Sequence, residues 1–247
     1  MYRKIIYDNY LSTGYSQLNR KIDLNRSFLA FDLNFTNLLP ISNDNVLLEI
    51  GCGMGHFQEF LRCRGYSNRV AIDIGPEQIG YCQENFEGEY LLVKDTNIFL
   101  QNHPRFFDCI IMNDVIEHFT KNEIVDILQR IKRSLKDSGK FIMRTPNMAA
   151  FFCGASRYGD FTHEVGFTER SIQQLLLATG FEQVECFPEK SYIRSRYKRI
   201  LFSFFSRFLV SMLKAIVFLE RPGGNYPKIF SKNLIVTANN NGSVNNI

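Results

Sequence analysis

Residues 46–61 constrain the fold more than any other stretch. They contain a short apolar run, then a glycine-rich turn, then the start of a helical pattern. The run Val46–Ile50 favours a strand and carries one acidic residue, Glu49. The turn contains Gly51, Gly53 and Gly55. Glycine adopts backbone angles that other residues avoid and lets a ligand approach the main chain. The helix that follows has free N–H groups in its first turn, so a ligand is expected at the glycines.

The spacing of these glycines separates two classes of cofactor site. A dinucleotide fingerprint requires glycine at the first, third and sixth positions, where the pyrophosphate meets the helix N-terminus. His56 stands at the sixth position, and the string E-x-G-x-G-x-G resembles motif I of the class I S-adenosylmethionine-dependent methyltransferases. The resemblance implies that the turn lies under the methionine part of S-adenosylmethionine. The cofactor-binding residues that it implies are Glu49, Gly51, Cys52, Gly53 and Phe57.

Two further strand ends carry acidic residues that suit an adenosine. The second apolar run places Asp73 at the carboxyl end of a strand beside the first, where a carboxylate can accept both ribose hydroxyls. A solvated Asp at a strand end explains the same pattern. Ile74 and Gln78 follow Asp73 and are expected to face the same ligand. In the methyltransferase family the Asp after the third strand holds the adenine amino group, and Asp95 with Thr96 matches that position.

A fourth apolar strand, Phe107–Met112, runs into a polar cluster. The cluster consists of Asn113, Asp114, Glu117 and His118. With Asp108 near the start of the strand, the D-x-x-E-H string resembles motif IV and its continuation in many O-methyltransferases. Ligands of open parallel sheets bind at the carboxyl ends of the strands. We therefore expect the cluster to lie where the sulfonium of the cofactor must be, with Asn113 among the cofactor-binding residues.

Two histidines are candidates for a catalytic base. A neutral imidazole is available at pH 7, and His118 is the first candidate, with Asp114 or Glu117 orienting it. The second candidate is His163, in a loop after the fifth strand, because many small-molecule methyltransferases carry a His before Phe-Thr there. A structural role for His163 in fixing that loop is equally open.

A metal site competes with this interpretation. Asp114, Glu117 and His118 match the E-x-x-E-H cluster that binds a divalent ion in ubiquinone-type O-methyltransferases, with Asp replacing the first Glu. Two carboxylates and one histidine suit a hard or borderline cation. The same D-V-I-E-H string also occurs widely in metal-free relatives, so the sequence leaves the metal undecided.

Strands alternate with helical patterns along the chain, which predicts a doubly wound α/β fold with right-handed crossovers. We expect a Rossmann-like sheet of seven mostly parallel strands, the last of them, at 233–238, an antiparallel edge. Residues 1–40 are expected to form a helical cap, whose aromatic segment Tyr7–Ser12 either folds over the cofactor as a lid or packs on the sheet. The remaining predicted units are a core of 41–188 and 229–240, a helical insertion of 189–228 and a disordered tail of 241–247.

The insertion is basic and rich in phenylalanine, and residues 200–219 read as an amphipathic helix. Its polar stripe consists of Ser203, Arg207, Ser211 and Lys214. The length suffices to span a bilayer. However, Arg207 and Lys214 would together cost about 5–7 kcal/mol at the membrane centre. A helix of residues 194–219 lying in the bilayer interface fits better, while a helix that covers the sheet or joins two subunits explains the same pattern.

Charge and cysteine content narrow the setting. A formal net charge of +4 gives no indication of nucleic-acid binding. The 6 cysteines include no C-x-x-C pair, which favours buried free thiols and a reducing compartment. The first residues lack the apolar core of a signal peptide. The sequence thus predicts a cytoplasmic protein, with peripheral contact at the inner face of a membrane if the insertion binds lipid.

Together these features predict an S-adenosylmethionine-dependent O-methyltransferase. The expected acceptor is a sugar hydroxyl of a bacterial surface glycan or lipid-linked saccharide, methylated by in-line transfer with a histidine base. An alternative within the same class is a quinone or other aromatic O-methyltransferase. A different alternative is a non-catalytic S-adenosylmethionine-binding partner protein. The sequence specifies no oligomeric state.

Overall fold

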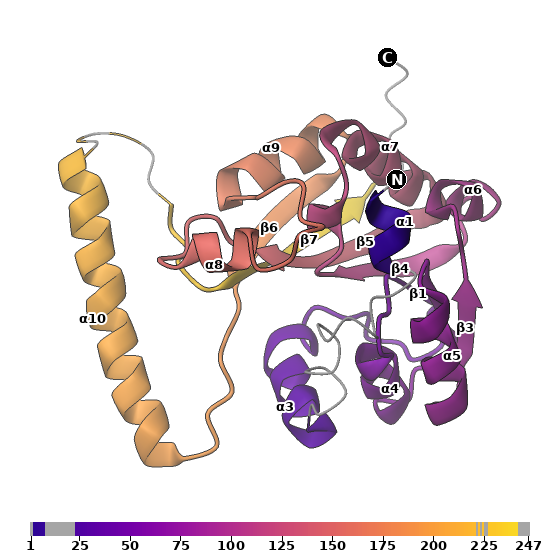
Figure 1. Cartoon of the computed structure of the whole chain (residues 1–247), viewed down its shortest axis with the longest axis horizontal. Coiled ribbons are helices and arrows are strands. Elements are labelled where there is room, and N and C mark those ends of the chain that lie inside the picture. Colours follow the sequence, from indigo (N-terminus) through magenta and orange to yellow (C-terminus); the bar gives the residue numbers. More distant parts are fainter. Residues whose placement is uncertain (1, 8–22, 221, 223, 225–226, 242–247) are drawn as a thin grey trace.

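The structure is a computed structural model that describes residues 2–7, 23–220, 222, 224 and 227–241. Its centre is one sheet with helices on both faces (Figure 1). The strands run in the order β3-β2-β1-β4-β5-β7-β6, which confirms the expected doubly wound, mostly parallel sheet of seven strands. Their bounds are β1 Leu47–Ile50, β2 Arg69–Asp73, β3 Glu89–Leu92, β4 Phe107–Asn113, β5 Leu135–Pro146, β6 Glu182–Pro188 and β7 Asn233–Asn240.

The last strand, β7, lies in a different place from the one expected. It pairs antiparallel with β5 on one side and with β6 on the other. The predicted antiparallel direction is therefore right, and the predicted edge position is wrong. All but one of the residues of β7 are buried, and a strand that is apolar on both faces is stabilised inside a sheet. β6 mixes half-buried with exposed residues and forms the edge instead.

Helices cover both faces of the sheet. One face is covered by α6 Thr96–Gln101, α7 Lys121–Ser134 and α9 Glu169–Ala178. The opposite face is covered by α3 Leu24–Phe35, α4 His56–Cys63 and α5 Pro76–Asn85. The short helices are α1 Tyr2–Tyr7, the 3-10 helix η1 Ile116–His118 and α8 Cys153–Arg157. This layering leaves the ends of the strands as the places where a ligand can reach the sheet.

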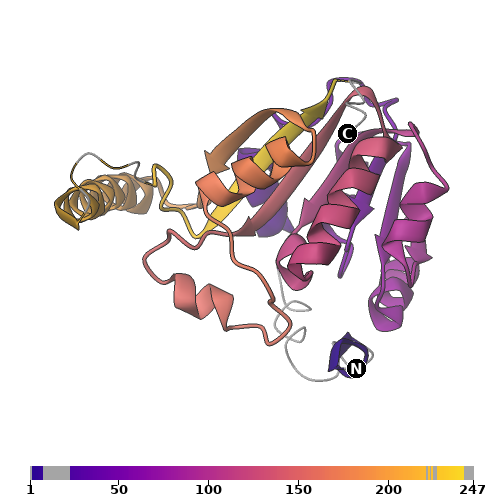
Figure 2. The same cartoon turned by 90° about the horizontal axis from the view of Figure 1, so that it is seen from above.

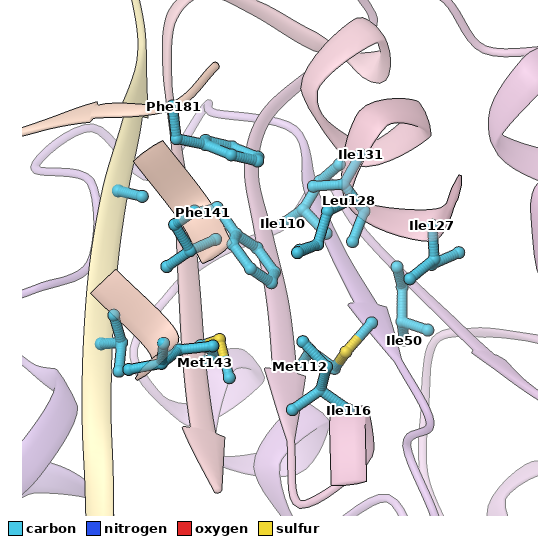
Figure 3. Close-up of a cluster of buried hydrophobic side chains, with 14 of the residues drawn as sticks. Ile50, Ile110, Met112, Ile116, Ile127, Leu128, Ile131, Phe141, Met143 and Phe181 are labelled. Atoms are coloured by element: carbon cyan, nitrogen blue, oxygen red, sulfur yellow. The ribbon is translucent and has the colours of Figure 1, made fainter. Parts of the chain in front are cut away.

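Alternation along β4 fills the hydrophobic cores on both faces. Ile110 and Met112 lie in one buried cluster with Leu128 of α7 (Figure 3). Cys109 and Ile111 alternate with these residues along the strand and belong to the other buried cluster, under α3 and α4. Successive side chains of a strand point to opposite faces. Polar side chains that follow β4 therefore gather beyond its carboxyl end rather than within the cores.

The helical insertion before the last strand is present as α10 Arg196–Glu220. It stands away from the sheet in both views (Figures 1 and 2). No residue of α10 is buried in the described structure. By length and composition alone, α10 is long and apolar enough to cross a membrane.

Two of the sequence predictions fall outside the described residues. They are the part of the aromatic N-terminal segment at residues 8–12 and the tail at 242–247. Tyr7, the last residue of α1, is described, and its ring centroid lies 6.4 Å from that of His118.

Candidate functional site

The carboxyl ends of the central strands open into a cavity of about 1130 Å³. Every residue predicted from the sequence to bind the cofactor or to act in catalysis lines this cavity. They are Glu49, Gly51, Cys52, Gly53, Phe57, Asp73, Ile74, Gln78, Asp95, Thr96, Asn113, Asp114, His118 and His163. The structure thus brings together residues from four strand ends and from the loop after β5 at one site.

The glycine turn after β1 has the geometry that its sequence requires. Gly51, Gly53 and Gly55 have φ angles of 73°, 52° and 72°, which lie in the left-handed region that favours glycine. A Cβ atom on Gly51 would come within 2.4 Å of Val115 Cγ2, so this glycine lets two backbone segments pack closely. A Cβ atom on Gly53 would meet nothing within 4 Å. The space above Gly53 is therefore open to a ligand.

Asp73 holds two of the ligand-facing loops in place. Its Oδ2 accepts a hydrogen bond from Gly53 N at 2.9 Å, and its Oδ1 accepts one from Gly75 N at 2.9 Å. Burial raises the pKa of Asp73, while these backbone amides oppose the shift. A carboxylate oxygen can accept more than one hydrogen bond, so Asp73 fits ribose hydroxyls as well as the loops that it joins.

Glu49 is a buried acid that lacks a full set of partners. Its side chain is 2% exposed, and its Oε2 has no hydrogen-bond partner among the described residues. Burial raises its pKa to about 8, while the nearby amides of Gln58 and Asn113 lower it in part. Both polar atoms of the Asn113 amide also lack partners within the described residues. An ammonium group in the cavity would satisfy Glu49, and the amino acid end of S-adenosylmethionine supplies one.

The expected adenine side of the cavity is built around α6. Asp95 caps this helix, because its Oδ1 accepts hydrogen bonds from Asn97 N at 2.9 Å and Ile98 N at 3.2 Å. Gln78 places a buried Oε1 without a described partner at the same cavity. Ile74 lies at the rim, where its side chain is 42% exposed. These groups offer a polar edge and an apolar flank for a planar base.

Phe57 lines the cavity from below. Its ring centroid lies 5.0 Å from that of Phe31 and 5.0 Å from that of Phe35, in edge-to-face arrangements. Most of its contacts are therefore with α3, which packs on α4 at this point. Phe57 supports the floor of the cavity and is 4% exposed.

Asp114 has a different partner from the one expected. It forms an ion pair with Arg144 of β5, and Arg144 Nη1 also approaches Glu189 Oε1 at 3.4 Å. The backbone of Asp114 has a φ of 55°, and its N–H donates to the carbonyl oxygen of Arg144 at 2.9 Å. The expectation that Asp114 or Glu117 orients His118 is not met, because Asp114 binds Arg144 and Glu117 Oε2 accepts a hydrogen bond from the Thr145 hydroxyl. Asp114 instead forms an ion pair with the half-buried Arg144 at the edge of the cavity.

His118 is oriented by a hydrogen-bonded pair in the loop after β5. Its Nδ1 lies 2.7 Å from Thr162 Oγ1, and that hydroxyl lies 2.6 Å from Asp160 Oδ1. A carboxylate only accepts hydrogen bonds, so Thr162 donates to Asp160 and accepts from the Nδ1–H of His118. This order leaves the lone pair on Nε2. Burial, with a contribution from His163, lowers the pKa of His118 to about 4, and the ring is neutral at pH 7.

His163 lies beside His118, with 4.7 Å between the two ring centroids. Its Nδ1 is 2.9 Å from the carbonyl oxygen of Ser156, so Nδ1–H donates a hydrogen bond to that oxygen. Arg157 binds the carbonyl oxygens of His163 and Glu164 and fixes the loop. His163 therefore both belongs to a rigid loop and lines the cavity.

The residues that could hold a metal ion differ from the expected set. Ligand atoms of Glu117, His118 and His163 lie within 4.8 Å of one another, whereas Asp114 is bound to Arg144. Glu117 Oε2 accepts a hydrogen bond from the Thr145 hydroxyl at 3.1 Å, and its Oε1 has no described partner. Burial, with a contribution from Asp114, raises the pKa of Glu117 well above its usual range. One carboxylate and two imidazoles are ligands that transition metals accept.

Sequence reasoning gave no role to several residues of this site. They are Arg144, Asp160, Thr162 and Glu189. Asp160 and Thr162 directly precede His163, so the loop string was visible but its contact with His118 was not. Asp108, by contrast, lies at the amino end of β4, where it accepts hydrogen bonds from Val46 N at 2.8 Å and Lys136 Nζ at 2.7 Å.

Comparisons with known proteins agree with this fold. The family described as "Methyltransferase domain" matches residues 17–186. Among curated protein sequences, none matches this chain. A methyltransferase from Archaeoglobus fulgidus, described as SAM-dependent, has a similar structure, with a TM-score of 0.66, 17% identity, and coverage of 88% of this chain and 94% of that one.

Two similar structures carry more specific descriptions. The 1,6-didemethyltoxoflavin-N1-methyltransferase of Burkholderia thailandensis, solved with S-adenosylhomocysteine, has a TM-score of 0.58 and 16% identity, with coverage of 96% of this chain and 88% of that one. Phosphoethanolamine N-methyltransferase 2 of Haemonchus contortus, solved with S-adenosyl-L-methionine, has a TM-score of 0.55 and 16% identity, with coverage of 94% and 59%. At such identities the likeness concerns the fold.

Proposed function

Because the chain belongs to the methyltransferase domain family and is an S-adenosylmethionine-dependent enzyme, we propose that it methylates a hydroxyl oxygen of a saccharide with His118 as the base. The observation that carries this proposal is the chain of hydrogen bonds from His118 through Thr162 to Asp160. His118 lines the cavity in which we place the cofactor, so a base and a methyl donor meet in one space.

The cofactor, when bound, supplies a methyl group on a positively charged sulfur. Gly53 leaves room for it, Glu49 binds its ammonium, and Asp73 accepts its ribose hydroxyls. The buried setting strengthens each of these interactions, because charges interact more strongly when water is excluded. The protein's remaining task is to align the acceptor and to take up its proton.

A base is needed for a hydroxyl acceptor in particular. A sugar hydroxyl is far too weak an acid to ionise at neutral pH, whereas an amine already offers a lone pair when neutral. A positioned base contributes about 10²–10⁴-fold to the rate. His118 Nε2 carries the lone pair that would take up the proton of the hydroxyl, and Thr162 keeps the ring in the required tautomer and orientation. A histidine fixed in this way favours oxygen over nitrogen as the site of methylation.

The wall beside the histidines supports a polyhydroxylated acceptor. Polar and charged side chains also line the cavity, from β5, the loop after it, the segment before β7 and the start of β7. They are Ser156, Asp160, Arg144, Lys232 and Asn233. Such groups hydrogen-bond to hydroxyls from several directions. We infer a bacterial surface glycan or a lipid-linked saccharide as the acceptor.

Transfer of radiolabelled methyl groups tests this proposal. Wild-type protein is incubated with labelled S-adenosylmethionine and with the lipid-linked and polymeric saccharide fractions of the producing cell. We expect label in a saccharide fraction, with losses of about 10²–10⁴-fold for His118→Ala. His103→Ala is the matched control, because His103 bonds Phe99 O at 2.8 Å and does not line the cavity. Equal activity of His118→Ala and wild type would refute the role of the base.

One observation favours a second candidate function. Glu117, His118 and His163 place three ligand atoms within 4.8 Å, which supports a metal-dependent methyl transfer to a quinone or another aromatic hydroxyl. This candidate predicts that a chelator abolishes turnover and that Mn²⁺ or Zn²⁺ restores it. A third outcome, binding of S-adenosylhomocysteine without turnover on any fraction, would indicate a non-catalytic partner protein.

A further inference from the structure

Helix α10 presents an apolar surface that the described structure leaves uncovered. Large side chains along it are strongly exposed, including Phe204 at 68%, Phe205 at 62% and Phe208 at 66%. None of its residues is buried, and Figures 1 and 2 show it standing clear of the sheet and of its covering helices. A contiguous apolar surface of this kind marks a site of contact with a partner protein or a membrane.

The surface has two chemically different sides. At 3.6 residues per turn, the polar residues Ser203, Arg207 and Lys214 fall on one stripe. The opposite side is broad and apolar. It contains Phe202, Phe205, Leu209, Met212 and Ile216. A helix with a wide apolar side and a basic stripe is typical of binding in the plane of a membrane surface.

The charge of α10 indicates the kind of surface. Its basic residues are Arg196, Lys198, Arg199, Arg207 and Lys214, and its acidic residue is Glu220. A cationic helix is attracted to anionic lipid headgroups in addition to the burial of its apolar side. Two copies of α10 that met through their apolar sides would gain nothing from this charge.

We propose that α10 docks the enzyme on an anionic bilayer, with the helix lying in the interface. Arg207 and Lys214 lie within the apolar stretch, so a spanning helix would bury both charges without a described partner, whereas an interfacial helix leaves them at the headgroups. The apolar side then enters the acyl chains. One bilayer surface accounts for both sides of the helix.

The connections of α10 link this surface to the active site. The segment before the helix begins at Glu189, which binds Arg144 and accepts a hydrogen bond from Asn233 Nδ2 at 2.9 Å. The segment after the helix ends at Lys232, which lines the cavity together with Asn233, the first residue of β7. Both connections therefore leave from the rim of the site. Resting on the proposed function, this arrangement favours an acceptor that the membrane presents, namely a lipid-linked saccharide.

Cosedimentation with vesicles tests the docking without acceptor or cofactor. We expect the full chain to bind phosphatidylglycerol-containing vesicles, with binding to pure phosphatidylcholine vesicles weaker on the order of tenfold, and weakened further by salt. The double variant Phe205→Ser/Leu209→Ser should lose binding on the order of tenfold or more. Leu177→Ser is the matched control, because Leu177 is 57% exposed on α9 and remote from α10 in the sequence.

The orientation of the helix can be read from single tryptophans, since the chain contains none. Phe205→Trp and Ile216→Trp lie on the apolar side about three turns apart, and Val210→Trp lies on the polar stripe. Brominated lipids quench a tryptophan that reaches the acyl chains. Strong quenching at 205 and 216 with weak quenching at 210 is expected for a helix lying in the interface.

Three results would overturn the proposal. Quenching that depends on how far along the helix the tryptophan lies, and not on which side of the helix carries it, would indicate a spanning segment. Absence of vesicle binding would exclude docking. A dimer that the same serine variants dissociate, without vesicle binding, would assign the surface to a second copy of the chain. The methyl transfer assay with the polymeric saccharide fraction does not require vesicle binding, so the two proposals fail separately.

Discussion

Glu49 is expected to release a proton when the cofactor site is filled. Burial raises the pKa of this carboxyl to about 8, so at pH 7 about nine molecules in ten are protonated. An ammonium group placed against Glu49 favours the carboxylate and lowers its pKa. Binding of S-adenosylhomocysteine, which carries the same ammonium, is therefore coupled to the loss of close to one proton at pH 7.

The size of the effect follows from linkage. If the pKa of Glu49 falls below about 5 in the complex, the apparent affinity rises by close to tenfold between pH 6 and pH 7. Titration calorimetry in two buffers of different ionisation enthalpy counts the protons directly. The titrations extend no higher than pH 7.5, because the α-amino group of the ligand itself titrates at about pH 8. Glu49→Gln should bind more weakly and release no proton.

The same shift has a consequence for stability. The pKa of Glu49 is raised in the folded protein, so its contribution is greatest below about pH 4.5 and is lost as the pH rises toward 8. By pH 7 the loss amounts to about 3 kcal/mol. Glu49→Gln should unfold at a higher temperature than wild type at pH 8 when no cofactor is bound. Proton release that persists in Glu49→Gln, or that is absent from wild type, would refute this account of the site.

Three further predictions follow from other parts of the site. Thr162→Val should lower kcat by about 10–100-fold with unchanged S-adenosylhomocysteine affinity, while Thr162→Ser retains most activity, because only the hydroxyl orients His118. At saturating cofactor the rate should hold from pH 8 down to about pH 5 and fall toward pH 4, since burial lowers the pKa of His118 to about 4; a midpoint near pH 6.5 would contradict this. Gly51→Ala should destabilise the fold by about 2–4 kcal/mol through strain and contact with Val115, and Gly53→Ala by about 1–2 kcal/mol through strain alone, as measured by denaturant unfolding.

The cofactor side of the site could be predicted because it depends on local sequence. Each strand ends at a recognisable change from apolar to polar residues, as at Asp73 and Asn113. Parallel strands bring their carboxyl ends to one edge of the sheet, so residues that are far apart in sequence share one cavity without any knowledge of tertiary contacts. The glycine turn at Gly53 marked the end of the first strand.

The partners of the candidate catalytic residues could not be predicted in the same way. His118 and Thr162 are 44 residues apart, and Asp114 and Arg144 are 30 residues apart. Which side chain meets which depends on how the loop after β5 folds back over η1, where Glu164 N and Val165 N donate to the carbonyl of Glu117. The place of β7 is likewise a matter of pairing, because an apolar strand near a terminus fits an edge or an interior position.

The chemical shift of the transferred methyl group tests the central claim most directly. S-adenosylmethionine with a carbon-13 methyl group is incubated with the wild-type protein and the lipid-linked saccharide fraction, and the product is examined by NMR. The account predicts a methyl ether signal that wild type and His103→Ala produce and that His118→Ala does not. A methylamine or carbon-bound methyl signal from wild type would contradict the assignment of a hydroxyl acceptor and of His118 as its base.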